Sequence, residues 1–271
     1  MLRWIWVYAL INSLTIGVFE VSQEIFNRYE LKYLISYEEY LQLAAILKER
    51  MNLDPYGDHD GKYNIVSLYY DSDDRKIYYE TKNKLRFRQK LRLRIYNQTT
   101  ADSISFFEIK QKFGNVVNKR RTILPLSKGY DLSNTESLSN IPDLDVFRAS
   151  NNQILKEVHH FKSLYHLHPE VVVSYDRQAF SGIEEPDLRV TFDYNLMCRN
   201  DDLRIENGPQ GMFFIPEDTV VLEVKVSSSV PFWLARLLND MQLARQSVSK
   251  YCTSIDLTDN QAHRQQHTAY I

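Results

Sequence analysis

The sequence predicts one α+β domain whose antiparallel strands close, or nearly close, into a barrel with a polar interior. The first observation is a series of segments that alternate between charged and apolar residues, as strands with two different faces do. The second is that lysine and arginine dominate the charged faces and recur at consecutive same-face positions. The third is a small number of helical segments, which can cover the apolar outer faces.

Composition limits the class of protein. The chain has 271 residues, of which 44% are hydrophobic and 25% charged, so it can bury a sizeable core. No linker-like stretch and no repeat of 20 to 50 residues divides it, which favours a single domain. The formal net charge is only −2, yet residues 82–121 hold twelve Lys/Arg against two acids. A local concentration of cations in a near-neutral chain indicates a specific anionic ligand.

The segment 84–96, KLRFRQKLRLRIY, shows the alternation most clearly. Cations occupy its even positions, and leucine, phenylalanine and glutamine alternate with them: the cations are Lys84, Arg86, Arg88, Lys90, Arg92 and Arg94. We predict a strand with its cations facing the barrel interior and Leu91, Leu93 and Ile95 facing outward beneath a helix. The opposite choice would bury unpaired guanidinium groups, which costs several kcal/mol each.

The remaining strands and helices follow from similar patterns. Ser36 and Glu39 form a capping box that begins a helix over 37–51, and Pro231 begins a last amphipathic helix over 231–241. A short helix or turn is expected over 73–83 and helical sequence over about 143–165. The predicted strands are 28–35, 62–71, 103–112, 116–126, 169–180, 187–196 and 219–226. Strands 103–112 and 116–126 form a hairpin about Gly114.

Charged residues share one side of most of these strands. For any single strand, the simpler interpretation is the solvated face of an antiparallel sheet. Rows of like charge repel, however, and several cationic strands together need a bound polyanion or inward acids to offset that repulsion. The aligned sets are Arg28, Glu30 and Lys32; Glu108, Lys110 and Lys112; Lys119 and Arg121; Arg189, Thr191 and Asp193; and Glu223 and Lys225.

Cysteine content and the chain ends add limits. Cys198 and Cys252 are too few for a disulfide framework, which fits a reduced, intracellular protein, and no zinc-type spacing is present. Residues 4–19 are uncharged but short for a membrane span. A membrane anchor, a packed helix and a product of an upstream start codon all remain open for this segment. We expect a tunnel domain over 23–258, between this apolar segment (1–22) and a frayed polar tail (259–271).

The order of the strand motifs resembles one family. The motifs are RYELKYLI, YNIVSLYYD, KLRLRIY, FFEIKQK, NKRR, VSYDRQAF, LRVTFD, VLEVKV and SVSKY. In this order they resemble the polyphosphate polymerase domain of the vacuolar transporter chaperone (VTC) complex and its bacterial relatives. That domain belongs to the CYTH-like triphosphate tunnel metalloenzymes. Arg28, Glu30 and Lys32 stand where the wider group has E-x-E-x-K, which resembles the polymerase branch rather than the triphosphatases and cyclases.

The resemblance implies an eight-stranded antiparallel tunnel that moves the γ-phosphoryl group of ATP onto polyphosphate with Mn²⁺ or Mg²⁺. It places Arg92, Arg94 and Lys250 at the reacting phosphates and Glu223 at the metal, with Glu108 and Glu30 as further metal candidates. It assigns phosphate binding to Lys32, Lys110, Lys119, Arg121, Arg177 and Ser249. The charge pattern adds Arg88, Lys90, Lys112, Arg189 and Lys225.

Other functions remain as alternatives. The same tunnel could belong to a metal-dependent inorganic or nucleoside triphosphatase, or to a catalytically silent polyphosphate-binding module. Nucleic-acid binding is disfavoured because the cations alternate with leucine and isoleucine rather than with exposed aromatic residues. The expected location is cytoplasmic or membrane-associated, and the resemblance allows a membrane-protein partner. The sequence leaves the oligomeric state open.

Overall fold

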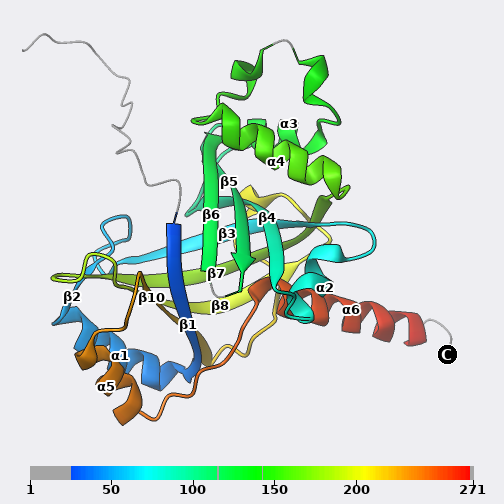
Figure 1. Cartoon of the computed structure of the whole chain (residues 1–271). Coiled ribbons are helices and arrows are strands. Elements are labelled where there is room, and N and C mark those ends of the chain that lie inside the picture. The colour runs from blue at the N-terminus through cyan, green and yellow to red at the C-terminus, as the bar shows by residue number, and fades with distance from the viewer. Residues whose placement is uncertain (1–25, 115, 142, 269–271) are drawn as a thin grey trace, which may run out of the picture.

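Eight antiparallel strands form a closed ring in the computed structural model, which describes residues 26–114, 116–141 and 143–268. The order around the ring is β7-β3-β4-β5-β6-β1-β10-β8, and β8 pairs back to β7. The predicted eight-stranded tunnel is therefore confirmed (Figure 1). Short strands β2 (Met51–Leu53) and β9 (Met212–Phe213) extend the sheet beside β7 and β8. The ring strands are β1 (Phe26–Ser36), β3 (Lys62–Asp71), β4 (Phe87–Tyr96), β5 (Ile104–Phe113), β6 (Val116–Pro125), β7 (His168–Gly182), β8 (Arg189–Arg199) and β10 (Thr219–Val226).

The seam between β1 and β6 is the shortest strand pairing of the ring within the described residues. There, only Phe26–Arg28 of β1 pair with β6, after which the two strands diverge. A coil from the C-terminal region continues the wall along the same edge of β1. The amide of Gln246 donates to the carbonyl of Lys32 at 2.9 Å, and Arg245 bridges to Tyr33. The tunnel wall thus depends on residues more than 200 positions apart in the chain.

The helices lie outside the ring in three groups (Figure 1). The predicted capping box begins α1, with Glu39 N donating to Ser36 Oγ at 3.1 Å and Ser36 N donating to Glu39 Oε2 at 2.7 Å. The groups are α1 (Tyr37–Lys48) with α5 (Phe232–Asp240), α3 (Leu126–Asn134) with α4 (Asn152–Leu164), and α2 (Lys76–Lys82) with α6 (Lys250–Thr268). Short 3-10 turns cover Leu138–Asn140, Leu144–Phe147 and Ile205–Asn207.

The sequence expectations were wrong about where the first helix ends and about which helix is the last. The first helix ends at Lys48 rather than at residue 51, because Met51 begins β2 against β7. The helix after Pro231 is not the last one. Helix α6 follows it and continues to Thr268, so the expected frayed tail is mostly helical. Its apolar stripe is narrow, and the buried residues in it include Tyr251 and Ile255, both 1% exposed. We infer that the helix is stabilised mainly by packing against the tunnel and less by its own amphipathic pattern.

The strand β4 also begins later than expected. Lys84 has a left-handed backbone (φ +53°) at the chain reversal that follows α2, and the strand starts at Phe87. The guanidinium of Arg86 lies 4.7 Å from the ring centroid of Phe113, outside the cavity. Two of the six alternating cations therefore do not reach the tunnel interior.

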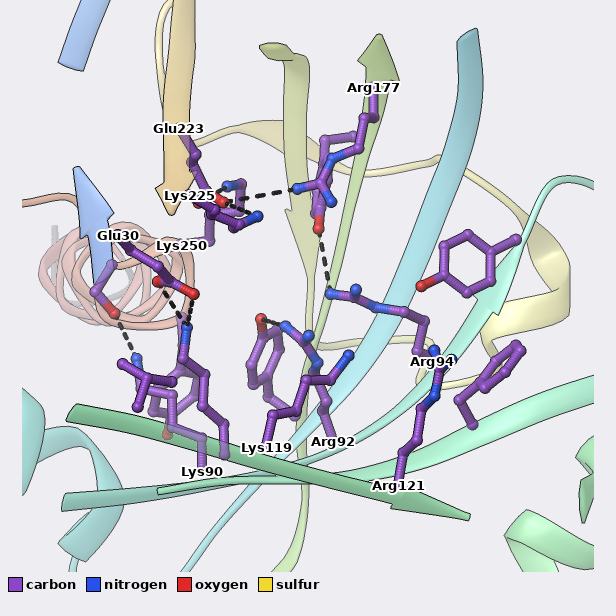
Figure 2. Close-up of a pocket in the computed structure, with 18 of the residues that line it drawn as sticks. Glu30, Lys90, Arg92, Arg94, Lys119, Arg121, Arg177, Glu223, Lys225 and Lys250 are labelled. Atoms are coloured by element: carbon purple, nitrogen blue, oxygen red, sulfur yellow. Dashed lines mark hydrogen bonds and ion pairs between the residues drawn. The ribbon is translucent and has the colours of Figure 1, made fainter. Parts of the chain in front are cut away.

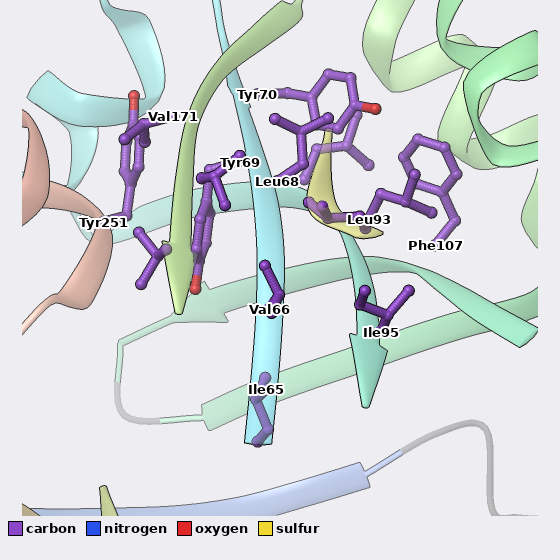
Figure 3. Packing of buried hydrophobic residues seen from close by; sticks show 14 of the residues in the cluster. Ile65, Val66, Leu68, Tyr69, Tyr70, Leu93, Ile95, Phe107, Val171 and Tyr251 are labelled. Carbon is purple, nitrogen blue, oxygen red and sulfur yellow. The ribbon is translucent and has the colours of Figure 1, made fainter. Parts of the chain in front are cut away.

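The outer face of β4 is buried as predicted. Leu91 and Leu93 are 0% exposed and belong to the larger apolar cluster, in which Leu93 and Ile95 lie near Phe107 (Figure 3). Helix α3 approaches so closely that a Cβ at Gly129 would lie 2.9 Å from Leu93 Cδ1. The face assignment that directs Arg92 and Arg94 inward is therefore confirmed. A second apolar cluster lies under α1 and α5.

Among the described residues, no helix is both long enough and apolar enough to cross a bilayer. The apolar segment 1–22 lies outside the described residues.

The face assignment can be tested with one substitution and a control. Leu93→Arg should cost at least about 4 kcal/mol of unfolding free energy, because it buries an unpaired guanidinium under α3. Leu85→Arg, at a side chain that is 48% exposed, should change stability by no more than about 0.5 kcal/mol. Chemical denaturation followed by circular dichroism measures both, and a stably folded Leu93→Arg variant would contradict the assignment.

Candidate functional site

The ring encloses a cavity of about 1440 Å³ whose lining is strongly cationic. Figure 2 shows Lys90, Arg92, Lys119 and Arg121 facing Arg177, Glu223, Lys225 and Lys250 across the lumen. Among the described residues, only four acids line the cavity, Glu30, Asp54, Asp102 and Glu223. This excess of positive charge suits a polyanion. The fourteen lining cations are Lys32, Arg88, Lys90, Arg92, Arg94, Lys110, Lys112, Lys119, Arg121, Arg177, Arg189, Lys225, Arg245 and Lys250.

Glu108 is the counter-ion of a cluster of three cations, Arg92, Arg94 and Lys119. Its side chain is only 1% exposed, and the β4–β5 register places it opposite Arg92. Arg92 Nε lies 2.6 Å from Glu108 Oε2, Lys119 Nζ contacts Oε1, and Arg94 Nε lies 3.8 Å away. Burial alone would raise the pKa of Glu108, but Arg92, Lys119 and Arg94 hold it well below its usual range. The carboxylate therefore stays ionised and orients Arg92.

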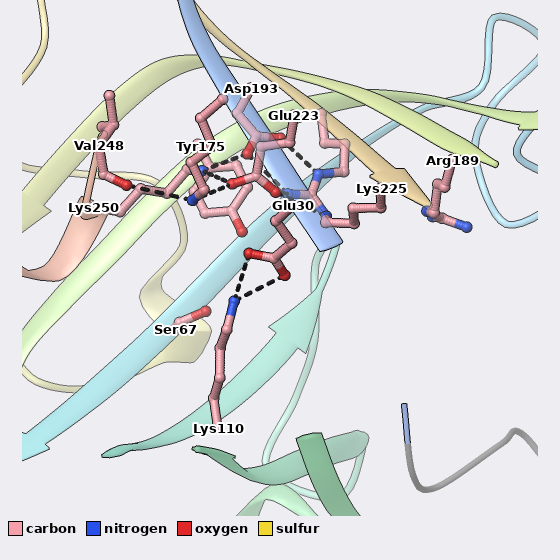
Figure 4. A network of polar contacts seen from close by, with 12 residues as sticks. Glu30, Ser67, Lys110, Tyr175, Arg189, Asp193, Glu223, Lys225, Val248 and Lys250 are labelled. Atoms are coloured by element: carbon pink, nitrogen blue, oxygen red, sulfur yellow. Dashed lines mark hydrogen bonds and ion pairs between the residues drawn. The ribbon is translucent and has the colours of Figure 1, made fainter. Parts of the chain in front are cut away.

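Glu223 and Asp193 form a second cluster, on the opposite wall (Figure 4). Lys250, the first residue of α6, places its Nζ 2.6 Å from Asp193 Oδ2 and 3.3 Å from Glu223 Oε1. Glu223 also contacts Lys32 and Lys225, each at 2.8 Å. Burial opposes ionisation of Glu223, yet Lys225, Lys250 and Lys32 hold its pKa well below the usual range.

Arg177 is fixed by Asp193 within the same cluster. Its Nε and Nη2 donate to the two carboxylate oxygens at 2.6 and 2.8 Å. Asp193 is 0% exposed, and its pKa lies below the usual value because Arg177 and Lys250 outweigh burial. This two-pronged contact holds the guanidinium plane at the cavity wall.

Other predicted cations of the cavity contact polar groups or lie beside one another. Glu30 accepts two 2.9 Å hydrogen bonds from Lys110 Nζ, which joins β1 to β5, and the pKa of Glu30 is lowered because Lys110, Lys32 and Lys225 outweigh its burial. Lys90 Nζ donates to Ser249 Oγ at 2.8 Å. Arg189 contacts Asp54, while Arg88 and Lys112 face each other in the β4–β5 register.

The cavity thus brings together every predicted site residue except Glu108, which lies directly behind Arg92. Sequence reasoning missed Asp193 as a site residue, although it had been placed on a charged face with Arg189. It also missed Tyr69 and Tyr175, whose hydroxyls accept hydrogen bonds from Arg92 and Arg94 at 3.0 and 3.2 Å. Tyr69 is two residues from Ser67 and Tyr175 two residues from Arg177, so each shares the inward face of its strand. That spacing was the signal by which the sequence could have identified them.

Three lysines in the cavity have unusual acidity. Burial lowers the pKa of Lys90, Lys119 and Lys225 to about 8, although Glu108 and Glu223 partly offset this for the last two. The ligand-free tunnel therefore holds ammonium groups that are destabilised by one another and by poor solvation. A bound anion would favour their protonated forms.

The fold and this cavity define a β-tunnel with a cationic interior. The chain belongs to the VTC domain family, whose profile matches residues 27–258. Comparison with curated proteins found no match.

Three solved structures are similar to the chain. A putative adenylyl cyclase from Hippeastrum, described as having a dominant triphosphatase activity, is 13% identical with a TM-score of 0.48, covering 86% of this chain and 96% of that one. The PH1819 protein from Pyrococcus horikoshii OT3 is 12% identical with a TM-score of 0.45, covering 84% and 98%. A putative adenylate cyclase from Vibrio parahaemolyticus is 13% identical with a TM-score of 0.39, covering 82% and 94%.

The acidity of the buried lysines predicts an unusual pH dependence of stability. Between about pH 8 and about pH 9 the unfolded chain binds more protons than the folded one, so the unfolding free energy should rise with pH in this range. Cys198 and buried tyrosines such as Tyr40 and Tyr63, whose pKa values are raised to about 12, oppose the trend increasingly at higher pH. Urea denaturation at about pH 7.5 and about pH 9 measures the rise. Saturating tripolyphosphate should abolish it, and a fall in stability without ligand would contradict the prediction.

Proposed function

We propose that this protein is an ATP-dependent polyphosphate polymerase, which transfers the γ-phosphoryl group of ATP to a polyphosphate chain inside the tunnel. The observation that carries the proposal is a cavity within the strand ring that, among the described residues, is lined by fourteen cations and four acids. Membership of the VTC domain family supports the choice of polyphosphate as the anion. A linear polyanion can contact cations from all sides of such a cavity at once.

The lining residues supply what phosphoryl transfer requires. The reaction asks the protein mainly to hold the phosphates in line and to stabilise charge on their oxygens. Inward cations recur along one strand about every 7 Å, so β4, β5 and β6 each provide successive contacts along a phosphate chain. Arg92 and Arg94 offer planar forks to the reacting phosphate, and Lys250 adds a point charge from the opposite wall. An acceptor phosphate is already ionised, so no general base is needed.

A divalent metal would need ligands from the substrate itself. The described residues contain no group of three His, Cys, Asp or Glu side chains suited to a metal. Glu223 lines the cavity, but ammonium groups contact both of its oxygens. Mg²⁺ and Mn²⁺ accept one or two carboxylates together with phosphate oxygens and waters. The residues therefore fit an ion that arrives with the phosphates and contacts Glu223, with Glu30 as an alternative ligand; when bound, it would neutralise phosphate charge.

Sizing of the products tests the proposal. Purified protein incubated with ATP and Mn²⁺ should form long phosphate chains, resolved by gel electrophoresis. Arg92→Lys keeps the charge beside Glu108 but loses the planar fork, and it should slow chain formation by about a hundredfold or more. Release of inorganic phosphate alone would identify a triphosphatase. Binding without turnover would identify a silent polyphosphate-binding module.

The metal assignment has its own test. Glu223→Gln should abolish turnover while tripolyphosphate binding persists, because the surrounding cations remain. Calorimetric titration of Mn²⁺ should show tight binding to the wild-type protein only when tripolyphosphate is present. Tight Mn²⁺ binding without tripolyphosphate, or wild-type turnover by Glu223→Gln, would exclude a substrate-borne ion held by Glu223. Glu108→Gln is the comparison, because Glu108 does not line the cavity.

A further inference from the structure

Tyr69 lies on the inner wall of the tunnel without an assigned role. It is 5% exposed and lines the cavity, whereas its neighbour Tyr70 points to the other side of β3, towards Phe107 (Figure 3). The β3–β7 register shifts between Tyr69 and Tyr70, a type of irregularity that often re-aims side chains next to functional sites. Tyr69 is therefore directed into the site by its strand.

The ring of Tyr69 is held rigidly by α6. It stacks on the ring of Tyr251, with centroids 5.3 Å apart and planes 25° apart. The hydroxyl of Tyr251 donates in turn to Asp71, which also accepts the amides of Ile77 and Tyr78 at 2.8 and 2.9 Å. This chain of contacts leaves the Tyr69 ring little freedom, so its hydroxyl stays in one place.

The hydroxyl of Tyr69 sits beside the guanidinium that is best placed for a phosphate. Arg92 Nη1 donates to Tyr69 Oη at 3.0 Å, while Arg92 Nε is held by Glu108 at 2.6 Å. No other described residue makes a hydrogen bond to this hydroxyl. The oxygen accepts a hydrogen bond from Arg92, so the hydroxyl hydrogen is free to donate. Because Tyr69 lines the cavity, a ligand in the cavity can accept that hydrogen bond.

We propose that Tyr69 is a further phosphate-contacting residue, whose hydroxyl donates a hydrogen bond to the phosphate oxygen bound by Arg92. The inference rests on the proposed function, because it requires phosphate in the tunnel. It adds a neutral donor beside the guanidinium of Arg92. A neutral donor fixes the orientation of an oxygen without adding to the repulsion among the cations.

The charges around Tyr69 give this role a measurable signature. Burial would raise the pKa of Tyr69, but Arg92, Arg94 and Lys90 from β4 outweigh it and lower the pKa to about 8. The group packed against it from α6 is Tyr251, whose pKa is raised, first by burial and then by Asp71. A phosphate that accepts the hydrogen bond favours protonated Tyr69 and should raise its pKa. Lys90, Lys119 and Lys225 also titrate near pH 8, so the pH dependence of affinity cannot isolate Tyr69.

Ultraviolet absorption of tyrosinate separates Tyr69 from the lysines, and comparison with Tyr69→Phe separates it from Tyr96, a cavity tyrosine whose pKa is also lowered because Arg94 outweighs burial. A pH titration of the wild-type protein should show one tyrosine with a midpoint near 8, absent from Tyr69→Phe. Saturating tripolyphosphate should move that midpoint upward by at least about one pH unit. A titration unchanged by bound tripolyphosphate, or the absence of any tyrosine titrating in this range, would overturn the inference. The upward movement of the midpoint is measured in the wild-type protein and does not depend on the folding of a variant.

Binding provides the second arm. Tyr69→Phe keeps the stacked ring and should weaken tripolyphosphate binding by about tenfold or more, as expected for loss of a hydrogen bond to a charged group. Tyr70→Phe is the matched control, since it removes the adjacent hydroxyl, which contacts Ser133 outside the cavity. Its binding should be unchanged. Unaltered binding by Tyr69→Phe overturns only the role of Tyr69, whereas a wild-type protein that does not bind tripolyphosphate overturns the proposed function as well.

Discussion

The structure depends on ion pairs between buried carboxylates and the cations of the tunnel wall. A ring of strands that all direct lysine and arginine inward would be opposed by their mutual repulsion. Glu108, Asp193 and Glu223 are each less than a tenth exposed, and each contacts cations from more than one strand or helix. They allow the ligand-free tunnel to fold while leaving a large excess of positive charge for a polyanion to neutralise.

The same ion pairs connect the C-terminal region to the tunnel. Lys250 reaches between Asp193 and Glu223 from the first residue of α6, and the coil before it completes the wall that β6 leaves open beside Lys32. Tyr251, the next residue, stacks on Tyr69. The coil before α6 therefore supplies a stretch of wall, and α6 supplies a cation and the support for a cavity residue.

The geometry suits a reaction in which the protein contributes positioning and charge rather than bond-making groups. Glu108 sits behind Arg92 and orients it, whereas Glu223 faces the cavity, so the two carboxylates take different parts although both were candidates for metal binding. Burial lowers the pKa of Lys90, Lys119 and Lys225 to about 8, and a bound anion would raise it again. Charge in the tunnel is thereby coupled to the presence of its ligand.

The sequence by itself determined the local features. Alternation with a period of two assigned the faces of β4, because a one-residue shift would bury Arg92 and Arg94 under a helix, and the Ser36–Glu39 pattern located the start of α1. The tertiary structure alone decided the closure of the ring, the formation of α3 and α6, and the pairings of Lys250 with Asp193 and of Tyr69 with Arg92. These contacts join residues far apart in the chain, and their energy comes from burial and charge in a cavity that exists only after the strands close. No local pattern encodes that environment, so the counter-ion role of Glu108 and the place of Asp193 could not be predicted from their neighbours in the sequence.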